Sequence, residues 1–171
     1  MNAVERIPAT VLTGFLGAGK STLLRRVLTE EHGRKIAVIV NEFGEESIDS
    51  EIIVSDGDEQ IIQLSNGCLC CGIRDDLRAT LRDLALERNG GDLAFDQVMI
   101  ETTGLADPGP VTQTFFLDDE IATRYRPDAV LTLVDAVHGM GQLDTWREAR
   151  RQVGFADKLF VSKVEIGRAH V

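Results

Sequence analysis

The stretch GFLGAGKST, Gly14–Thr22, decides the fold of this chain. It fits the pattern G-x-x-x-x-G-K-[ST] of a phosphate-binding loop. An apolar, β-branched run, Ile7–Thr13, precedes it, and Ser21–Thr29 follows with apolar residues at helical spacing. Strand, glycine loop and helix in this order are the context that the motif requires. We therefore predict a site for the phosphates of a nucleoside triphosphate.

Each residue type in the loop has a chemical reason to be there. Glycines let backbone N–H groups turn toward the phosphates, and the start of the following helix adds the positive end of its dipole. The Lys20 side chain is expected to reach the β- and γ-phosphates, and the Ser21 hydroxyl to bind Mg²⁺. The predicted nucleotide-binding residues of the loop are Gly14, Gly17, Ala18, Gly19, Lys20, Ser21 and Thr22.

A carboxylate at the end of a second strand usually completes such a Mg²⁺ site. Glu101 ends the run QVMIE and is followed three residues later by Gly104, whose N–H can meet the γ-phosphate and sense its loss. Asp135, which ends AVLTLVD, is the competing candidate. The glycine after Glu101 resembles a nucleotide-sensing turn and favours Glu101. We predict that the catalytic residues are Lys20, Glu101 and Gly104.

Apolar runs alternate with amphipathic stretches along the rest of the chain. This rhythm predicts an α/β fold, a three-layer α/β/α P-loop NTPase with a mostly parallel sheet that is truncated at its C-terminal end. The acidic stretch Glu42–Gln60 interrupts the rhythm and is expected to be a mobile loop. The predicted strands are Lys35–Val40, Gln97–Ile100, Ala129–Val134 and Lys158–Val161, and the predicted helices are Asp75–Glu87, Gly109–Phe116 and Thr145–Val153.

All three cysteines lie in the segment GCLCCG, Gly67–Gly72. Three thiols this close cannot form a disulfide framework, but thiolates suit Zn²⁺ or a similar thiophilic ion. The predicted ligands Cys68, Cys70 and Cys71 leave a tetrahedral ion one ligand short. Water, a carboxylate such as Glu42 or a group from a partner would complete it. Buried structural cysteines and a reactive thiol pair remain alternatives.

The charge balance argues against two classes of partner. The chain has 28 acidic and 18 basic residues, a net charge of −10, which opposes binding to nucleic acid or to an anionic membrane surface. No apolar run approaches the length of a membrane span, and the N-terminus does not read as a secretion signal. We therefore expect a cytoplasmic protein.

Several motifs in order resemble the CobW-type family of metal-handling P-loop GTPases, which is similar to the GTPases that mature urease and nickel hydrogenase. GFLGAGKST resembles its Walker A motif, VNEFGE (Val40–Glu45) its first switch, GCLCC (Gly67–Cys71) its metal motif, and ETTGLADP (Glu101–Pro108) its Walker B motif and second switch. The resemblance covers about residues 7–163. Ser47 departs from it, because the family has glycine there.

The resemblance implies a GTPase that uses its nucleotide state to load or release a metal ion, zinc in many members and cobalt in those tied to cobalamin synthesis. It also implies that the three cysteines bind this ion and are coupled to the switches. GTP and GDP, a transition metal ion and a client metalloprotein are the expected partners, and a homodimer stays open. An ATP-dependent P-loop enzyme with a structural zinc site, or a nonfunctional fragment, are the alternatives.

Guanine selectivity in such GTPases comes from an [NT]-K-x-D segment after a late strand. Ser162 and Lys163 stand in its first two places, and serine is a familiar variant in the family, but Glu165 stands where aspartate is expected. The end of the chain, EIGRAHV, is a peptide that a common sequencing adapter encodes in one frame. We therefore expect an incomplete GTPase domain over residues 1–164, a non-native tail over 165–171, and no C-terminal family domain.

Overall fold

The computed structural model describes residues 5–41, 52–54, 60–62 and 73–164. The strands are β1 (Ile7–Gly14), β2 (Ile36–Asn41), β3 (Ile52–Val54), β4 (Gln60–Ile62), β5 (Gln97–Thr102), β6 (Tyr125–Asp135) and β7 (Lys158–Ser162). The helices are α1 (Lys20–Thr29), α2 (Ile73–Gly90), α3 (Pro108–Leu117), α4 (Asp119–Arg124), α5 (Gly139–Thr145) and α6 (Arg147–Gly154).

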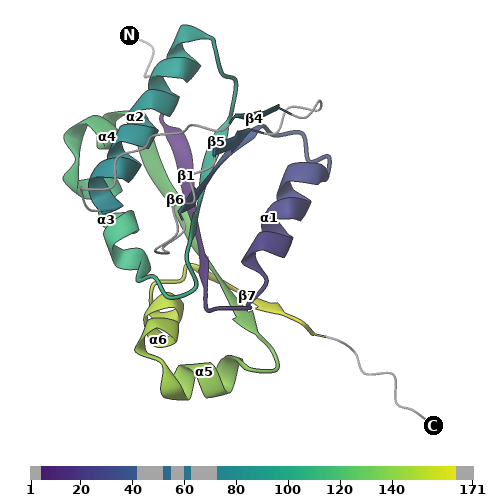
Figure 1. Cartoon of the computed structure of the whole chain (residues 1–171). Coiled ribbons are helices and arrows are strands. Elements are labelled where there is room, and N and C mark those ends of the chain that lie inside the picture. Colours follow the sequence, from purple (N-terminus) through teal and green to yellow (C-terminus); the bar gives the residue numbers. More distant parts are fainter. Residues whose placement is uncertain (1–4, 42–51, 55–59, 63–72, 165–171) are drawn as a thin grey trace.

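These strands form one sheet in the order β4-β3-β2-β5-β1-β6-β7. Neighbouring strands from β2 to β7 pair in parallel, whereas β3 and β4 are antiparallel additions at one edge. Helix α1 lies on one face of the sheet, and α2, α3 and α4 lie on the other (Figure 1). The predicted three-layer α/β/α architecture with a mostly parallel sheet is confirmed.

Side chains point alternately to the two faces of the sheet along each strand. Because neighbouring positions in the strands are both apolar, both faces are covered by apolar side chains. In β1, Val11 belongs to the core under α2 and α3, whereas its neighbour Leu12 packs with Leu24 of α1. In β2, Ile39 and Val38 divide between the two cores in the same way. This burial on both faces explains why the sequence shows continuous apolar runs rather than a polar–apolar alternation.

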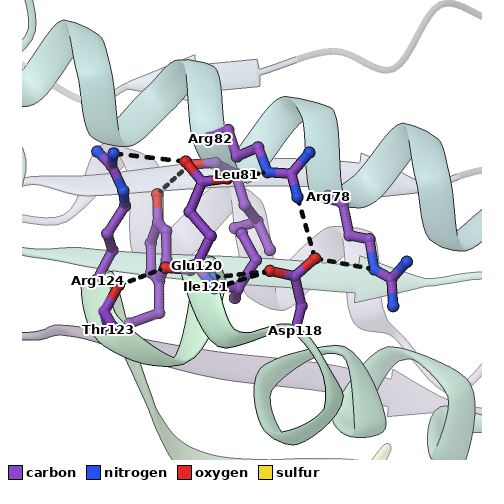
Figure 2. Close-up of polar contacts among 9 residues, drawn as sticks. Arg78, Leu81, Arg82, Asp118, Glu120, Ile121, Thr123 and Arg124 are labelled. Atoms are coloured by element: carbon purple, nitrogen blue, oxygen red, sulfur yellow. Dashed lines mark hydrogen bonds and ion pairs between the residues drawn. The ribbon is translucent and has the colours of Figure 1, made fainter.

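Helix α2 is joined to α4 by a network of ion pairs (Figure 2). One oxygen of Asp118 lies 3.3 Å from Arg78 and 3.2 Å from Arg82. Its other oxygen accepts hydrogen bonds from the backbone N–H groups of Glu120 and Ile121, and so caps α4. Because Asp118 contacts two arginines of α2 and also caps α4, this network joins the two helices.

Two details of the sequence-based prediction are wrong. The stretch Glu42–Gln60 is not loop throughout, because it contains β3 and the first residue of β4. Isoleucine and valine suit these strands, but their short length hid them among acidic residues. The helix predicted over Thr145–Val153 is also divided, since α5 ends at Thr145 and α6 begins at Arg147. Trp146 between them has an extended backbone, and its ring lies 5.7 Å from that of Phe15.

Among the residues that the structure describes, no helix is both long and apolar enough to cross a lipid bilayer.

Candidate nucleotide site

The loop Gly14–Gly19 joins β1 to α1 at the carboxyl end of the parallel strands. Gly14, Gly17 and Gly19 have φ angles of 148°, 74° and 98°, which residues with side chains rarely adopt. At Gly14 a Cβ atom would also lie only 2.6 Å from the carbonyl oxygen of Leu133. Gly19 is the N-cap of α1 and brings no side chain to its first N–H groups. The glycines therefore give the loop a shape with backbone N–H groups available at the helix start.

Lys20 and Glu101 carry the opposite charges of this site. Both are 9% exposed, and the Lys20 Nζ atom donates a hydrogen bond of 2.7 Å to the carbonyl oxygen of Gly14. Glu101 lies beside Leu12 in the register of β1 and β5. Burial lowers the pKa of Lys20, while the charge of Glu101 acts in the opposite direction. The two side chains that were predicted to serve phosphate and Mg²⁺ thus come from the start of α1 and from β5, and the charge of Glu101 acts on Lys20.

Gly104 lies directly against the loop. A Cβ atom on Gly104 would be 2.7 Å from the backbone nitrogen of Leu16 and 2.9 Å from its Cα atom. No side chain fits between two backbones at these distances, so only glycine allows this approach. The turn that follows Glu101 is therefore in contact with the phosphate-binding loop, as expected of a segment that senses a nucleotide.

The predicted base-recognition segment contacts the loop from the other side. The Ser162 hydroxyl donates a hydrogen bond of 2.6 Å to the carbonyl oxygen of Ala18, and Lys163 Nζ lies 2.7 Å from a carboxylate oxygen of Asp135. The hydrogen bonds from Lys163 and then from His138 hold the pKa of Asp135 well below its ordinary value. Asp135, the competing Mg²⁺ candidate, is thus engaged with Lys163 and His138.

Sequence reasoning missed one residue that touches this site. Gln152 of α6 is 1% exposed, and its Nε2 atom donates hydrogen bonds of 3.0 Å to the carbonyl oxygens of Gly104 and Ala106. A single glutamine in an amphipathic helix has no signature in the sequence. Its position 48 residues after Gly104 could be linked to the turn only by the fold.

The predicted thiophilic site, Cys68, Cys70, Cys71 and Glu42, lies outside the described residues, as do most of the first switch segment and Glu165. In the part of the chain that the structure describes, no three His, Cys, Asp or Glu side chains are grouped so as to hold a metal ion. The cysteine site therefore stays a prediction.

A parallel sheet with a glycine loop between its first strand and first helix defines the class as P-loop NTPase. A family model described as the CobW/HypB/UreG nucleotide-binding domain matches residues 8–170. The chain belongs to this family.

Relatives and solved structures agree with this assignment. Zinc chaperone YjiA of Escherichia coli is 49% identical over 160 residues, which are 94% of this chain and 50% of YjiA. Zinc-regulated GTPase metalloprotein activator 1 of Schizosaccharomyces pombe is 34% identical over 96% of this chain and 41% of its own. The crystal structure of Zn(II)-bound YjiA GTPase superposes with a TM-score of 0.70 at 46% identity, covering 92% of this chain and 49% of that one. The chain spans about half the length of the curated relatives it matches.

Proposed function

We propose that this chain is the nucleotide-binding part of a GTP-hydrolysing metallochaperone that couples its nucleotide state to the binding and transfer of zinc. The observation that carries the proposal is the convergence on one loop of Lys20, Glu101 and Gly104, which come from three segments. The zinc chaperone and GTPase names of the relatives support both the cargo and the nucleotide. Residues 1–164 are proposed to form this unit, with 165–171 as a tail.

The proposed chemistry is attack of water on the γ-phosphate in line with the leaving oxygen. Lys20 would place its positive charge against the β- and γ-phosphates, and the Gly104 N–H would contact the γ-phosphate. Leu105, which follows Gly104, is 51% exposed and cannot act as a base. We therefore expect positioning and charge to supply the catalysis, and intrinsic hydrolysis to be slow.

The oxygen ligands at this site suit Mg²⁺, a hard cation. The exposed hydroxyl of Ser21 at the start of α1 and the carboxylate of Glu101 would hold it. Bound there, Mg²⁺ would neutralise charge on the phosphates. On the other side of the loop, Ser162 and Lys163 would support the guanine base.

Zinc would bind as cargo rather than as a resident cofactor. The proposed ligands are Cys68, Cys70 and Cys71, with Glu42 as the fourth candidate. Since most of the first switch and all three cysteines lie between β2 and α2 in the sequence, a change of this stretch on GTP binding would change the zinc affinity. By thermodynamic linkage, zinc would then change the GTP affinity by the same factor.

The decisive experiment measures zinc affinity by competition with a chromophoric chelator, without nucleotide, with GDP and with a non-hydrolysable GTP analogue. A triple Cys68, Cys70, Cys71→Ser variant is the control. Zinc affinity that changes with nucleotide and disappears in the control is expected. Zinc affinity that ignores nucleotide, in protein shown to prefer GTP over ATP, would overturn the coupling.

A further inference from the structure

Two side chains from one turn of α6 contact the segment Gly104–Asp107, which follows Glu101. The Nε2 atom of Gln152 donates hydrogen bonds to the carbonyl oxygens of Gly104 and Ala106. Arg151 forms an ion pair with Asp107. The proposed hydrolysis gives neither Gln152 nor Arg151 a role at the phosphates. Their contacts with Gly104 to Asp107 therefore call for a separate explanation.

Helix α6 is itself attached to the sheet and to α3. The Thr132 hydroxyl of β6 donates a hydrogen bond of 2.9 Å to the backbone carbonyl oxygen of Gln152. At the end of α6, the Phe155 ring lies so close to Gly109 of α3 that a Cβ atom there would be 3.0 Å from its Cζ atom. The Gln152 side chain thus extends from a fixed helix to the turn, and it can define the position of the turn.

The bond to Gly104 matters because glycine has the widest backbone freedom. A hydrogen bond to its carbonyl oxygen fixes the orientation of the peptide group that follows it. The same residue lies against the backbone of Leu16 in the phosphate-binding loop. The amide of Gln152 therefore holds Gly104 close to the loop, where its N–H is proposed to meet the γ-phosphate.

The other half of the same amide is an independent observation. In the described part of the chain, the Oε1 atom of Gln152 is buried and has no hydrogen-bond donor. A buried acceptor without a donor costs free energy, and such atoms are rare in folded proteins. If the only role of Gln152 were to stabilise the fold, a side chain without this unpaired acceptor would give a larger free energy of unfolding.

We propose that Gln152 is a positioning residue, which holds the Gly104–Asp107 turn in the arrangement that receives the γ-phosphate. The inference rests on the proposed GTP-binding function. It gives α6 the role of fixing the position of the Gly104–Asp107 turn, which is proposed to sense the nucleotide. A change of the turn between nucleotide states would be transmitted through Gln152 and Arg151 to α6.

The test compares Gln152→Met, which keeps the length of the side chain and removes its donor, with the wild-type chain. Gln142→Met, the same change at a half-buried glutamine of the neighbouring α5, is the matched control. Affinities for GDP and for a non-hydrolysable GTP analogue are measured by calorimetry with Mg²⁺. Gln152→Met loses the hydrogen bonds to the carbonyl oxygens of both Gly104 and Ala106. Since the net contribution of one such hydrogen bond is about 0.5–1.5 kcal/mol, affinity for the analogue should fall about tenfold. GDP affinity should change little, and Gln142→Met should resemble the wild type.

A second measurement does not depend on nucleotide. Amide hydrogen exchange in the nucleotide-free proteins should be faster at residues 104–107 in Gln152→Met and unchanged in Gln142→Met. Unchanged exchange at these amides, or equal loss of affinity for GDP and the analogue, overturns the positioning role. A wild-type chain that does not distinguish GTP from ATP overturns the proposed function instead, and the exchange result still decides whether Gln152 holds the turn.

Discussion

Lys20, at the phosphate end of the sheet, and Asp118, between α2 and α4, are two charged side chains in contrasting surroundings. Asp118 meets two arginines and two backbone N–H groups at a partly exposed surface (Figure 2). Lys20 is buried, and its Nζ atom donates hydrogen bonds to the carbonyl oxygens of Gly14 and Phe15, while the charge of Glu101 only partly offsets the effect of burial. Burial lowers its pKa, whereas the contacts of Asp118 lower the pKa of that carboxyl.

This difference separates a charge that stabilises the fold from one that the fold must accommodate. The Asp118 carboxylate is ionised among groups that favour its charge, so removing it should cost stability. The Lys20 ammonium is held where burial disfavours its charge, so removing it should cost little stability and should affect anion binding instead.

The largest expected effect follows from changing Lys20→Met, which keeps the apolar stem and removes the charge. Affinity for GTP should fall about 10- to 100-fold, because a hydrogen bond to a charged group is worth roughly 1.5–3 kcal/mol. The nucleotide-free protein should unfold at the same or a higher temperature. Calorimetric titration and thermal melting measure the two quantities. A less stable protein with normal GTP affinity would remove the contrast between the two regions.

The second prediction concerns stability at the other region. Asp118→Ala should lower the free energy of unfolding by about 1–2 kcal/mol, since it removes a helix cap together with the ion pairs. Asp118→Asn keeps a capping oxygen and should cost less than about 1 kcal/mol. Urea unfolding measures both, and Asp119→Ala, a change at the exposed neighbour, is the control. Equal losses for alanine and asparagine would show that the charge, not the cap, stabilises α4. Nucleotide affinity should not change in any of the three.

The smallest effect is the pH dependence of the Asp118 contribution. The hydrogen bond from the Ile121 N–H and the charges of Arg82 and Arg78 lower the pKa of Asp118 against the effect of burial. A lowered pKa in the folded state means that the ionised form stabilises the fold above the unfolded value of about 3.9. This stabilisation is lost as the pH falls through the folded pKa. The difference in unfolding free energy between wild type and Asp118→Asn should therefore be constant from pH 7 to about 5 and should shrink below about 4.

Urea unfolding at several pH values measures this difference. If it stayed the same at pH 3, the effect of asparagine would come from shape and not from charge. Arg26 and Glu30 form an exposed ion pair at 2.8 Å at the C-terminal end of α1. The same difference in unfolding free energy, measured between wild type and Glu30→Gln, provides the comparison at a surface site.

Elements with a strong local pattern were predicted well. The sequence places β1, the glycine loop and α1 within two residues of their observed bounds, because the glycines are required locally and the strand is buried on both faces. Glu101 was placed at the end of β5 from the same kind of pattern, and in the structure its charge acts on Lys20. The strand β3 was missed, since its three residues are held by antiparallel pairing with β2 and not by a pattern of their own.

By itself, the sequence determined the class of fold and the residue types at the phosphates, because a loop of glycines before a helix with lysine and serine is a local requirement of phosphate binding. Only the tertiary structure decided that Gln152 bonds Gly104, that Ser162 bonds Ala18 and that Asp135 pairs with Lys163. These contacts join residues far apart in the chain. Each pair can form only because the fold places the two strands, helices or loops that carry its members next to each other.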